Sequence, residues 1–118
     1  MKRITLFLLI AFALNACKND PKVETGDILI TAEYEGMPEE NVEVALYDSY
    51  DAWFAYEYLE IQRTDEYGEV FFAELPAGKY FLEAEITKSS LFSLYKFDSI
   101  EVVVNLQKNK KLILTPGK

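Results

Sequence analysis

The sequence contains no histidine and a single cysteine, Cys17, and these two shortages exclude much of the chemistry that enzymes use. Without histidine there is no imidazole to activate a nucleophile, and the commonest zinc ligand is missing. A lone cysteine allows no intramolecular disulfide. Internal repeats and low-complexity segments are also absent, and 118 residues provide for one domain at most. We therefore expect no enzyme, no metal site and no cofactor.

The N-terminal segment has the composition of a secretory signal. Residues 1–3 carry two cations, and residues 4–14 follow as an apolar run that only Thr5 interrupts. A membrane-spanning helix needs about 20 apolar residues, and this run is shorter. It ends at the polar residues 18–22. We predict that residues 1–16 are a signal peptide.

The residues at the end of the apolar run, Leu-Asn-Ala-Cys at positions 14–17, resemble the lipobox of bacterial lipoproteins. That motif has an aliphatic residue three positions before the cysteine and a small residue directly before it, and Leu14 and Ala16 match it. The resemblance implies cleavage between Ala16 and Cys17 and acylation of the Cys17 thiol and amine. Two or more acyl chains anchor a protein stably. The alternative is a buried structural cysteine in an ordinary secreted protein.

The residues after Cys17 bear on the location of the protein. Lys18 replaces the aspartate that retains enterobacterial lipoproteins in the inner membrane. The run Lys18-Asn19-Asp20 is similar in part to the export signal of surface lipoproteins from Bacteroidota. We therefore predict an outer-membrane lipoprotein of the cell envelope, facing either the periplasm or the cell surface.

The mature chain is strongly acidic. Loss of Lys2 and Arg3 with the signal peptide leaves ten basic and twenty acidic side chains, a net charge of −10. Such a domain repels phosphate backbones, which excludes nucleic acid as a partner. It also disfavours electrostatic adhesion to anionic lipid, so the lipid on Cys17 is the predicted membrane attachment.

The sequence pattern changes from polar to alternating at Gly26. Residues 17–25 are short, polar and without periodicity, which predicts a lipidated tether. Beyond them, apolar and polar residues alternate in short runs between turn residues, as in half-buried strands. Seven such strands predict an all-β, two-sheet sandwich over residues 26–118. The predicted strands are residues 28–34, 42–47, 58–63, 70–72, 80–86, 100–106 and 112–114.

Two aromatic-rich stretches depart from this alternation. Residues 48–56 lie between the second and third predicted strands, and Ser49 or Asp51 could cap a short helical turn there. Such a turn would fold Trp53 back onto the domain. The pattern of residues 88–98 is ambiguous, and we interpret this stretch as a loop.

A longer motif carries a family resemblance. It reads Thr64-Asp65-x-x-Gly68-x-Val70-x-Phe72-x-x-Leu75-Pro76-x-Gly78-x-Tyr80-x-Leu82. This pattern resembles the signature of Cna B-type, carboxypeptidase regulatory-like and other prealbumin-like domains. Residues 46–53 also resemble small Bacteroidota lipoproteins in which a short aromatic helix links the second and third strands. The resemblance implies a seven-stranded prealbumin-like (Ig-like) sandwich with that short helical turn, preceded by the signal-peptide helix. It implies a hairpin at residues 65–68.

The reactions known in these families lack their residues here. Some Cna B-type domains form an isopeptide bond from a lysine on the first strand, and residues 28–34 contain none. The related ureide-pathway hydrolase relies on histidines. A site built from carboxylates alone, as in glycosidases, would need inward acids. The alternation places Glu83 and Glu85 on the outward face, where we interpret them as solvated surface. Asp48 and Asp51, with Asp65 and Glu66, match no calcium loop, and we assign them turn and cap roles.

The most distinctive remaining feature is a set of aromatic residues. Exposed aromatic faces bind sugar rings or protein partners. The alternative interpretation is that Trp53 and Phe54 close one open end of the sandwich. The candidate binding residues are Tyr50, Trp53, Phe54, Tyr56 and Tyr95.

We predict a non-enzymatic, membrane-anchored module that binds or scaffolds another envelope protein. The alternative function is a glycan-binding accessory module of a polysaccharide-uptake system, with the aromatic patch around Trp53 as its platform.

Overall fold

The computed structural model describes residues 24–117. The predicted signal peptide, the Ala16–Cys17 cleavage site and all but the last two residues of the predicted tether lie outside the described residues. The first strand begins at Thr25, one residue before the predicted domain boundary. The elements in chain order are β1 Thr25–Tyr34, β2 Met37–Pro38, β3 Glu43–Tyr47, α2 Tyr50–Phe54, β4 Glu60–Arg63, β5 Glu69–Pro76, β6 Gly78–Ser89, β7 Phe92–Val102, β8 Gln107–Ile113 and β9 Thr115–Pro116.

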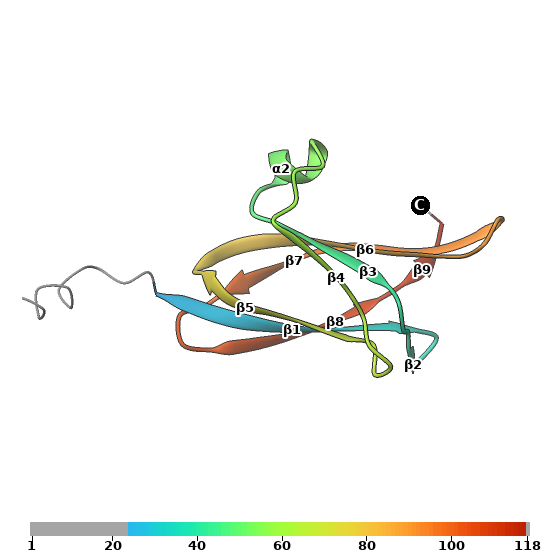
Figure 1. Cartoon of the computed structure of the whole chain (residues 1–118), viewed down its shortest axis with the longest axis horizontal. Helices are drawn as coiled ribbons and strands as arrows, with labels where there is room; N and C mark the ends of the chain where they lie inside the picture. Colours follow the sequence, from blue (N-terminus) through green and yellow to red (C-terminus); the bar gives the residue numbers. More distant parts are fainter. Residues whose placement is uncertain (1–23, 118) are drawn as a thin grey trace, which may run out of the picture.

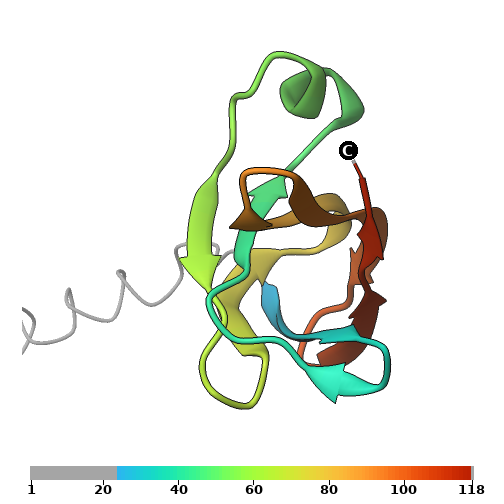
Figure 2. The same cartoon turned by 90° about the vertical axis from the view of Figure 1, so that its right-hand side faces the viewer.

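The strands form two sheets that face each other (Figures 1 and 2). In the first sheet, β1 pairs antiparallel with β5 and β2, and pairs in parallel with β8 along its other edge. The second sheet has the order β4-β3-β6-β7-β9 and is antiparallel throughout. The predicted all-β, two-sheet sandwich is confirmed, and α2 lies where the short aromatic helical turn was predicted. The seven predicted strands correspond to all of these strands except the two-residue β2 and β9.

The core lies between the two sheets and follows the alternation of the sequence. From the first sheet Ile28, Ile30 and Phe72 are fully buried, and from the second sheet Leu46 and Leu82 meet them. Burial of each such side chain contributes roughly 1.5–3 kcal/mol. No helix within residues 24–117 is long and apolar enough to cross a membrane.

The family motif forms a turn between the two sheets. Oδ1 of Asp65 accepts hydrogen bonds of 2.9 Å from the backbone N–H groups of Tyr67 and Glu69. Gly68 has a φ of 75°, and a Cβ atom there would lie 2.6 Å from the carbonyl oxygen of Ala32. The turn joins β4 of one sheet to β5 of the other, so the predicted hairpin within one sheet is wrong. The chain therefore crosses from one sheet to the other at this turn, and crosses back after β5.

The stretch predicted as a loop at residues 88–98 is instead the distal part of a long β6–β7 hairpin (Figure 1). Leu94 is fully buried, which sets the inward face of β7. Tyr95 and Phe97 belong to the opposite face, where α2 shields them. Because both faces of β7 carry aromatic or aliphatic residues, the period of two is hidden in the sequence. The last predicted strand, residues 112–114, is also too short, since β8 begins at Gln107.

Candidate binding groove on the outer face of the second sheet

Hydrogen bonds at both ends of α2 define the conformation of this segment. At the start, Oγ of Ser49 accepts a hydrogen bond of 2.9 Å from the backbone N–H of Ala52, so Ser49 and not Asp51 is the N-cap. At the end, Tyr56 has a φ of 60°. Its N–H donates to the carbonyl of Trp53 at 3.1 Å, and the N–H of Glu57 donates to the carbonyl of Ala52 at 2.8 Å. These two bonds form a Schellman motif, in which the position of Tyr56 is usually occupied by glycine.

The helix presses its tryptophan onto the outer face of the second sheet. The ring of Trp53 lies 4.4 Å from that of Phe97 between centroids, and Phe97 stacks on Phe81 at 5.9 Å and 8°. Trp53 therefore covers the middle of a sheet face. The interpretation that Trp53 and Phe54 close an open end of the sandwich is wrong. The α2 segment rises from that outer face in both views (Figures 1 and 2).

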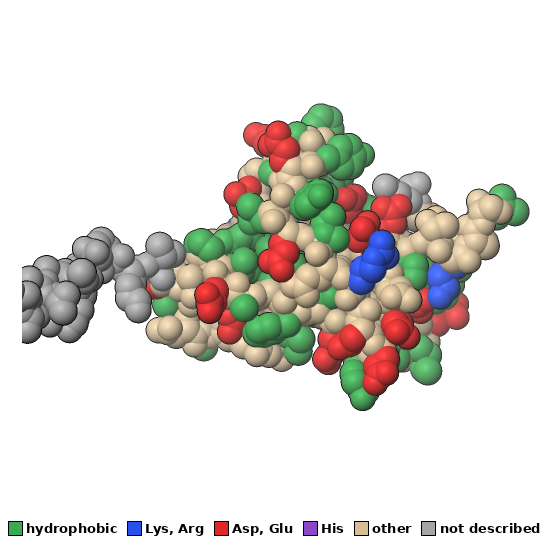
Figure 3. Space-filling view, viewed as in Figure 1, with side chains coloured by type: hydrophobic (Ala, Val, Ile, Leu, Met, Phe, Trp, Pro, Cys, Tyr) green, Lys and Arg blue, Asp and Glu red, His purple; other side chains and the backbone are tan. Residues whose placement is uncertain are grey.

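Four of the five candidate binding residues line one cavity of about 490 Å³, together with Glu83. They are Trp53, Phe54, Tyr56 and Tyr95. Phe54 is 76% exposed and Tyr56 72%, so a ligand can reach their rings, whereas Trp53 and Tyr95 are half-buried. Tyr50 is the exception, because it packs against Trp53 and does not line the cavity. Figure 3 shows apolar and acidic side chains gathered together around α2.

Glu83 is the residue of this site that the sequence interpretation missed. Its Oε2 accepts a hydrogen bond of 2.9 Å from the hydroxyl of Tyr95, and its Oε1 accepts one of 3.3 Å from the hydroxyl of Tyr47. Burial and then the charge of Glu83 raise the pKa of Tyr47 to about 12. Burial and the hydrogen bond to Glu83 also raise the pKa of Tyr95. The carboxylate is therefore an oriented acceptor on the floor of the cavity.

Two further hollows continue the cavity along the sheet. One of about 230 Å³ shares Tyr56 and Glu83 with it and adds Tyr47 and Tyr58. The next, of about 620 Å³, lies on the other side of Glu85. We refer to the three together as the outer groove. Its lining residues are Asn41, Glu43, Ala45, Tyr47, Trp53, Phe54, Tyr56, Tyr58, Ile61, Arg63, Glu83, Glu85, Ile86, Thr87 and Tyr95.

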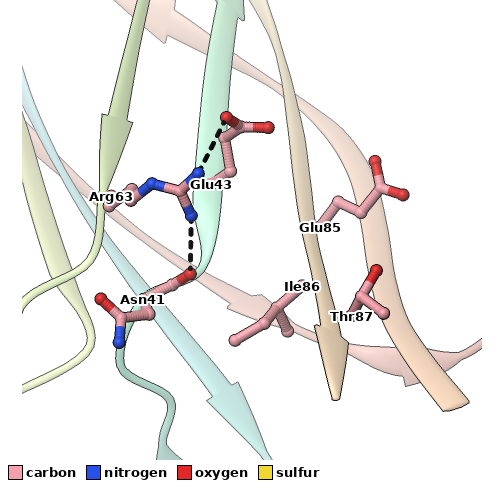
Figure 4. Close-up of a pocket in the computed structure, with 6 residues that line it drawn as sticks. All are labelled: Asn41, Glu43, Arg63, Glu85, Ile86 and Thr87. Atoms are coloured by element: carbon pink, nitrogen blue, oxygen red, sulfur yellow. Dashed lines mark hydrogen bonds and ion pairs between the residues drawn. The ribbon is translucent and has the colours of Figure 1, made fainter. Parts of the chain in front are cut away.

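The far end of the outer groove is more polar. Arg63 bridges Oε2 of Glu43 at 3.5 Å and the carbonyl of Asn41 at 3.5 Å (Figure 4). Glu85 lies on the neighbouring strand, directly across from Glu43 in the ladder. Glu83 lies two positions before Glu85 on β6, and therefore on the same face of the sheet. Among residues 24–117, the lining of the outer groove thus includes three carboxylates, Glu43, Glu83 and Glu85, and one cation, Arg63.

Residues 24–117 contain no group of three or more acidic or cysteine side chains that could hold a metal ion. Asp65, one of the acids considered for calcium, already accepts two backbone hydrogen bonds within its own turn.

No protein-family model matches the chain, and no curated protein matches it. Among solved structures, it is similar to the minor pilin of Streptococcus agalactiae, with a TM-score of 0.56 and 15% identity over 80% of this chain. This chain spans about half of that pilin (47%). It is also similar to a Pseudomonas aeruginosa protein proposed to bind carbohydrate, with a TM-score of 0.57 and 16% identity over 82% of this chain and 93% of the other.

A third similarity is to the 5-hydroxyisourate hydrolase of Klebsiella pneumoniae, with a TM-score of 0.47 and 19% identity over 85% of this chain and 100% of the other. At identities this low the likenesses concern the fold alone, because one fold serves many functions. The two likenesses with TM-scores above 0.5, together with the two facing sheets, show the prealbumin-like β-sandwich that the motif predicted.

Proposed function

We propose that this protein is a non-enzymatic binding module of the bacterial cell envelope, held to the membrane by lipid on Cys17, and that it binds another envelope protein in the outer groove. The observation that carries the proposal is the cavity itself. It combines exposed aromatic rings at Phe54 and Tyr56 with one oriented carboxylate, Glu83. Concave sites with apolar walls and few polar groups are typical ligand sites.

The arrangement of the rings supports binding to a macromolecule. Tyr and Trp are enriched among the residues that dominate protein interfaces. Here Trp53 is fixed by its contact with Phe97, while Phe54 and Tyr56 stand above the surface. A fixed base with exposed rings around it offers contact area with little loss of side-chain entropy on binding.

The attachment and the absence of catalysis rest on the sequence. The lipobox-like residues before Cys17 support lipidation, and the acidic mature chain supports attachment through acyl chains rather than through charge. The lack of histidine supports a binding role. We place the protein in the outer membrane.

Site-directed crosslinking in living cells tests the binding proposal. A photoreactive phenylalanine analogue replaces Phe54 in the full chain, and the matched control carries it at Tyr67, which is 63% exposed in the β4–β5 turn. We expect one discrete crosslinked protein for position 54 and none for position 67. Equal patterns at the two positions would contradict the proposal.

Lipid attachment is tested separately by labelling with radioactive palmitate. We expect the wild-type chain to incorporate label and Cys17→Ser to incorporate none, with the sandwich of residues 25–117 unchanged in its circular dichroism. Labelling of the Cys17→Ser chain would disprove the anchor without bearing on the outer groove.

A second function, glycan binding, has support of its own. Exposed aromatic rings beside a carboxylate also suit the apolar faces and hydroxyl groups of sugars. The similar Pseudomonas aeruginosa protein is itself proposed to bind carbohydrate. A glycan array distinguishes the two candidates, since this function requires a wild-type signal that Trp53→Ala and Phe54→Ala abolish.

A further inference from the structure

We propose that the outer groove recognises an arginine side chain of the partner protein, with the guanidinium paired to Glu83 and stacked on the surrounding aromatic rings. The inference rests on the proposed function of the groove, and it adds the chemical class of the ligand. Three features support it: the free acceptor positions of Glu83, the lack of an ion pair to Glu83 among residues 24–117, and the aromatic rings around it.

The hydrogen bonds of Glu83 leave room for a bidentate partner. A carboxylate offers about four acceptor positions on its two oxygens. Tyr95 uses one on Oε2 and Tyr47 uses one on Oε1, so one position on each oxygen is left. A guanidinium presents two parallel N–H groups in a fixed fork that matches a pair of carboxylate oxygens.

The charge of Glu83 is not balanced by an ion pair within the described part of the chain. Within residues 24–117, no lysine or arginine forms an ion pair with Glu83. Arg63, which lines the groove, pairs with Glu43. A cation supplied by a partner would pair with the carboxylate of Glu83.

The walls of the cavity suit the flat face of a guanidinium. Cations are attracted to the faces of tryptophan, tyrosine and phenylalanine, and arginine also stacks on them. Trp53, Phe54, Tyr56 and Tyr95 supply such rings around the carboxylate. A lysine ligand would carry the positive charge but not the two parallel N–H groups of a guanidinium. A neutral sugar would carry no positive charge to pair with Glu83. The combination of rings and oriented carboxylate therefore favours arginine.

The single tryptophan of the chain provides the readout, because Trp53 lines the cavity. The full chain, purified from membranes in non-ionic detergent, is titrated with the peptide acetyl-Gly-Ser-Arg-Ser-Gly-amide while the tryptophan emission is followed. The same peptide with citrulline in place of arginine is the isosteric neutral control, and a lysine peptide tests the fork. We expect the arginine peptide to bind about tenfold more tightly than the citrulline peptide, with lysine between them.

Two variants locate the effect. Glu83→Gln keeps the shape of the side chain and removes its charge, so the preference for arginine over citrulline should disappear. Glu66→Gln is the matched control, because it removes one exposed carboxylate outside the outer groove and should leave the preference intact. Phe54→Ala, at a largely exposed ring, should weaken both peptides.

The outcomes separate this inference from the proposed function. Equal binding of the arginine and citrulline peptides to the wild-type chain would overturn the inference, and so would an arginine preference that survives Glu83→Gln. If the Phe54 crosslink forms all the same, the groove still binds a protein and only the ligand class is wrong. Binding of a neutral glycan that Glu83→Gln leaves unchanged would also overturn the inference and favour the second function. Because the peptide comparison uses the wild-type chain, it is decisive even if a variant fails to fold.

Discussion

The hydroxyl of Tyr95 donates a hydrogen bond of 2.9 Å to Oε2 of Glu83, from the strand that flanks β6 on one side. Tyr47 does the same to Oε1 at 3.3 Å from β3 on the other side. Both tyrosines occupy diagonal positions in the ladder, since Tyr95 pairs with Glu85 and Tyr47 with Phe81. Diagonal neighbours are within reach of long aromatic side chains. Three neighbouring strands of the second sheet, β3, β6 and β7, thus hold one carboxylate at the base of the cavity.

The first prediction concerns Glu83→Gln. The pKa of Tyr47 is about 12, because of burial first and the charge and hydrogen bond of Glu83 second. Removing the charge should therefore lower this pKa, while burial keeps it above 10. Near-ultraviolet titration of tyrosinate absorbance measures the shift, with Tyr47→Phe in both backgrounds to assign it. An unchanged titration of Tyr47 in Glu83→Gln would contradict the coupling.

The second prediction follows for stability at high pH. The folded-state pKa values of Tyr47 and Tyr95 are raised above the ordinary value of 10.0. A raised pKa in the folded state contributes stability that is fully present below pH 10. For Tyr47 this contribution is lost as the pH rises from 10 to about 12. Urea unfolding across this range should show a fall in the free energy of unfolding that is smaller in Tyr47→Phe. An equally steep fall in Tyr47→Phe would refute it.

The sequence predicted the sandwich well, because its core strands are buried on one face. Ile28 and Ile30, or Leu82 and Ala84, alternate with outward residues, and period two reports that directly. The same rule failed for β7, where Tyr95 and Phe97 face a second apolar layer. A strand covered on both faces loses its alternation, and nothing local in its sequence distinguishes it from an aromatic loop.

The site was predicted only in its aromatic half. Trp53, Phe54 and Tyr56 are close in sequence, so their clustering is visible without a structure. Glu83 was correctly expected on the outward face, and for that reason was interpreted as solvated surface. Its role depends on two tyrosines that are 36 and 12 residues away along the chain. The alternation within one strand shows which residues face outward. It does not show which of them α2 covers, because that depends on the tertiary structure.

A third prediction concerns Thr64, the buried polar residue at the start of the family motif. Its Oγ1 accepts a hydrogen bond of 2.8 Å from the N–H of Val42 and donates one of 2.7 Å to the carbonyl of Glu39. Thr64→Val keeps the shape and leaves the buried N–H of Val42 without its side-chain acceptor. We expect a loss of about 1–3 kcal/mol in the free energy of unfolding, measured in urea.

The control for this prediction is Thr64→Ser, which keeps the hydroxyl and removes one methyl group. It should cost less than Thr64→Val, about 0.8 kcal/mol from the lost burial alone. If Thr64→Val proves as stable as the wild-type chain, the hydrogen bonds to Val42 and Glu39 do not hold this turn.

The last prediction uses the strained position of Tyr56. A φ of 60° is unfavourable for any residue with a Cβ atom, and the Schellman position normally carries glycine. A tyrosine is present here although its side chain is 72% exposed and adds little to the core. Backbone strain that persists in this way points to a functional use of the side chain. In this chain the ring of Tyr56 lines two of the three hollows of the outer groove.

Tyr56→Gly should therefore stabilise the fold and weaken the site. Relief of the left-handed strain, offset by the greater entropy of glycine in the unfolded chain, gives a gain of about 0.5–1 kcal/mol in the free energy of unfolding. Binding of the arginine peptide, followed by Trp53 emission, should become weaker because one ring is lost. Tyr56→Ala is the matched control, since it loses the same ring and keeps the strain. A variant Tyr56→Gly that is no more stable than Tyr56→Ala would show that the left-handed backbone costs nothing here, and unchanged peptide binding in both would remove Tyr56 from the site.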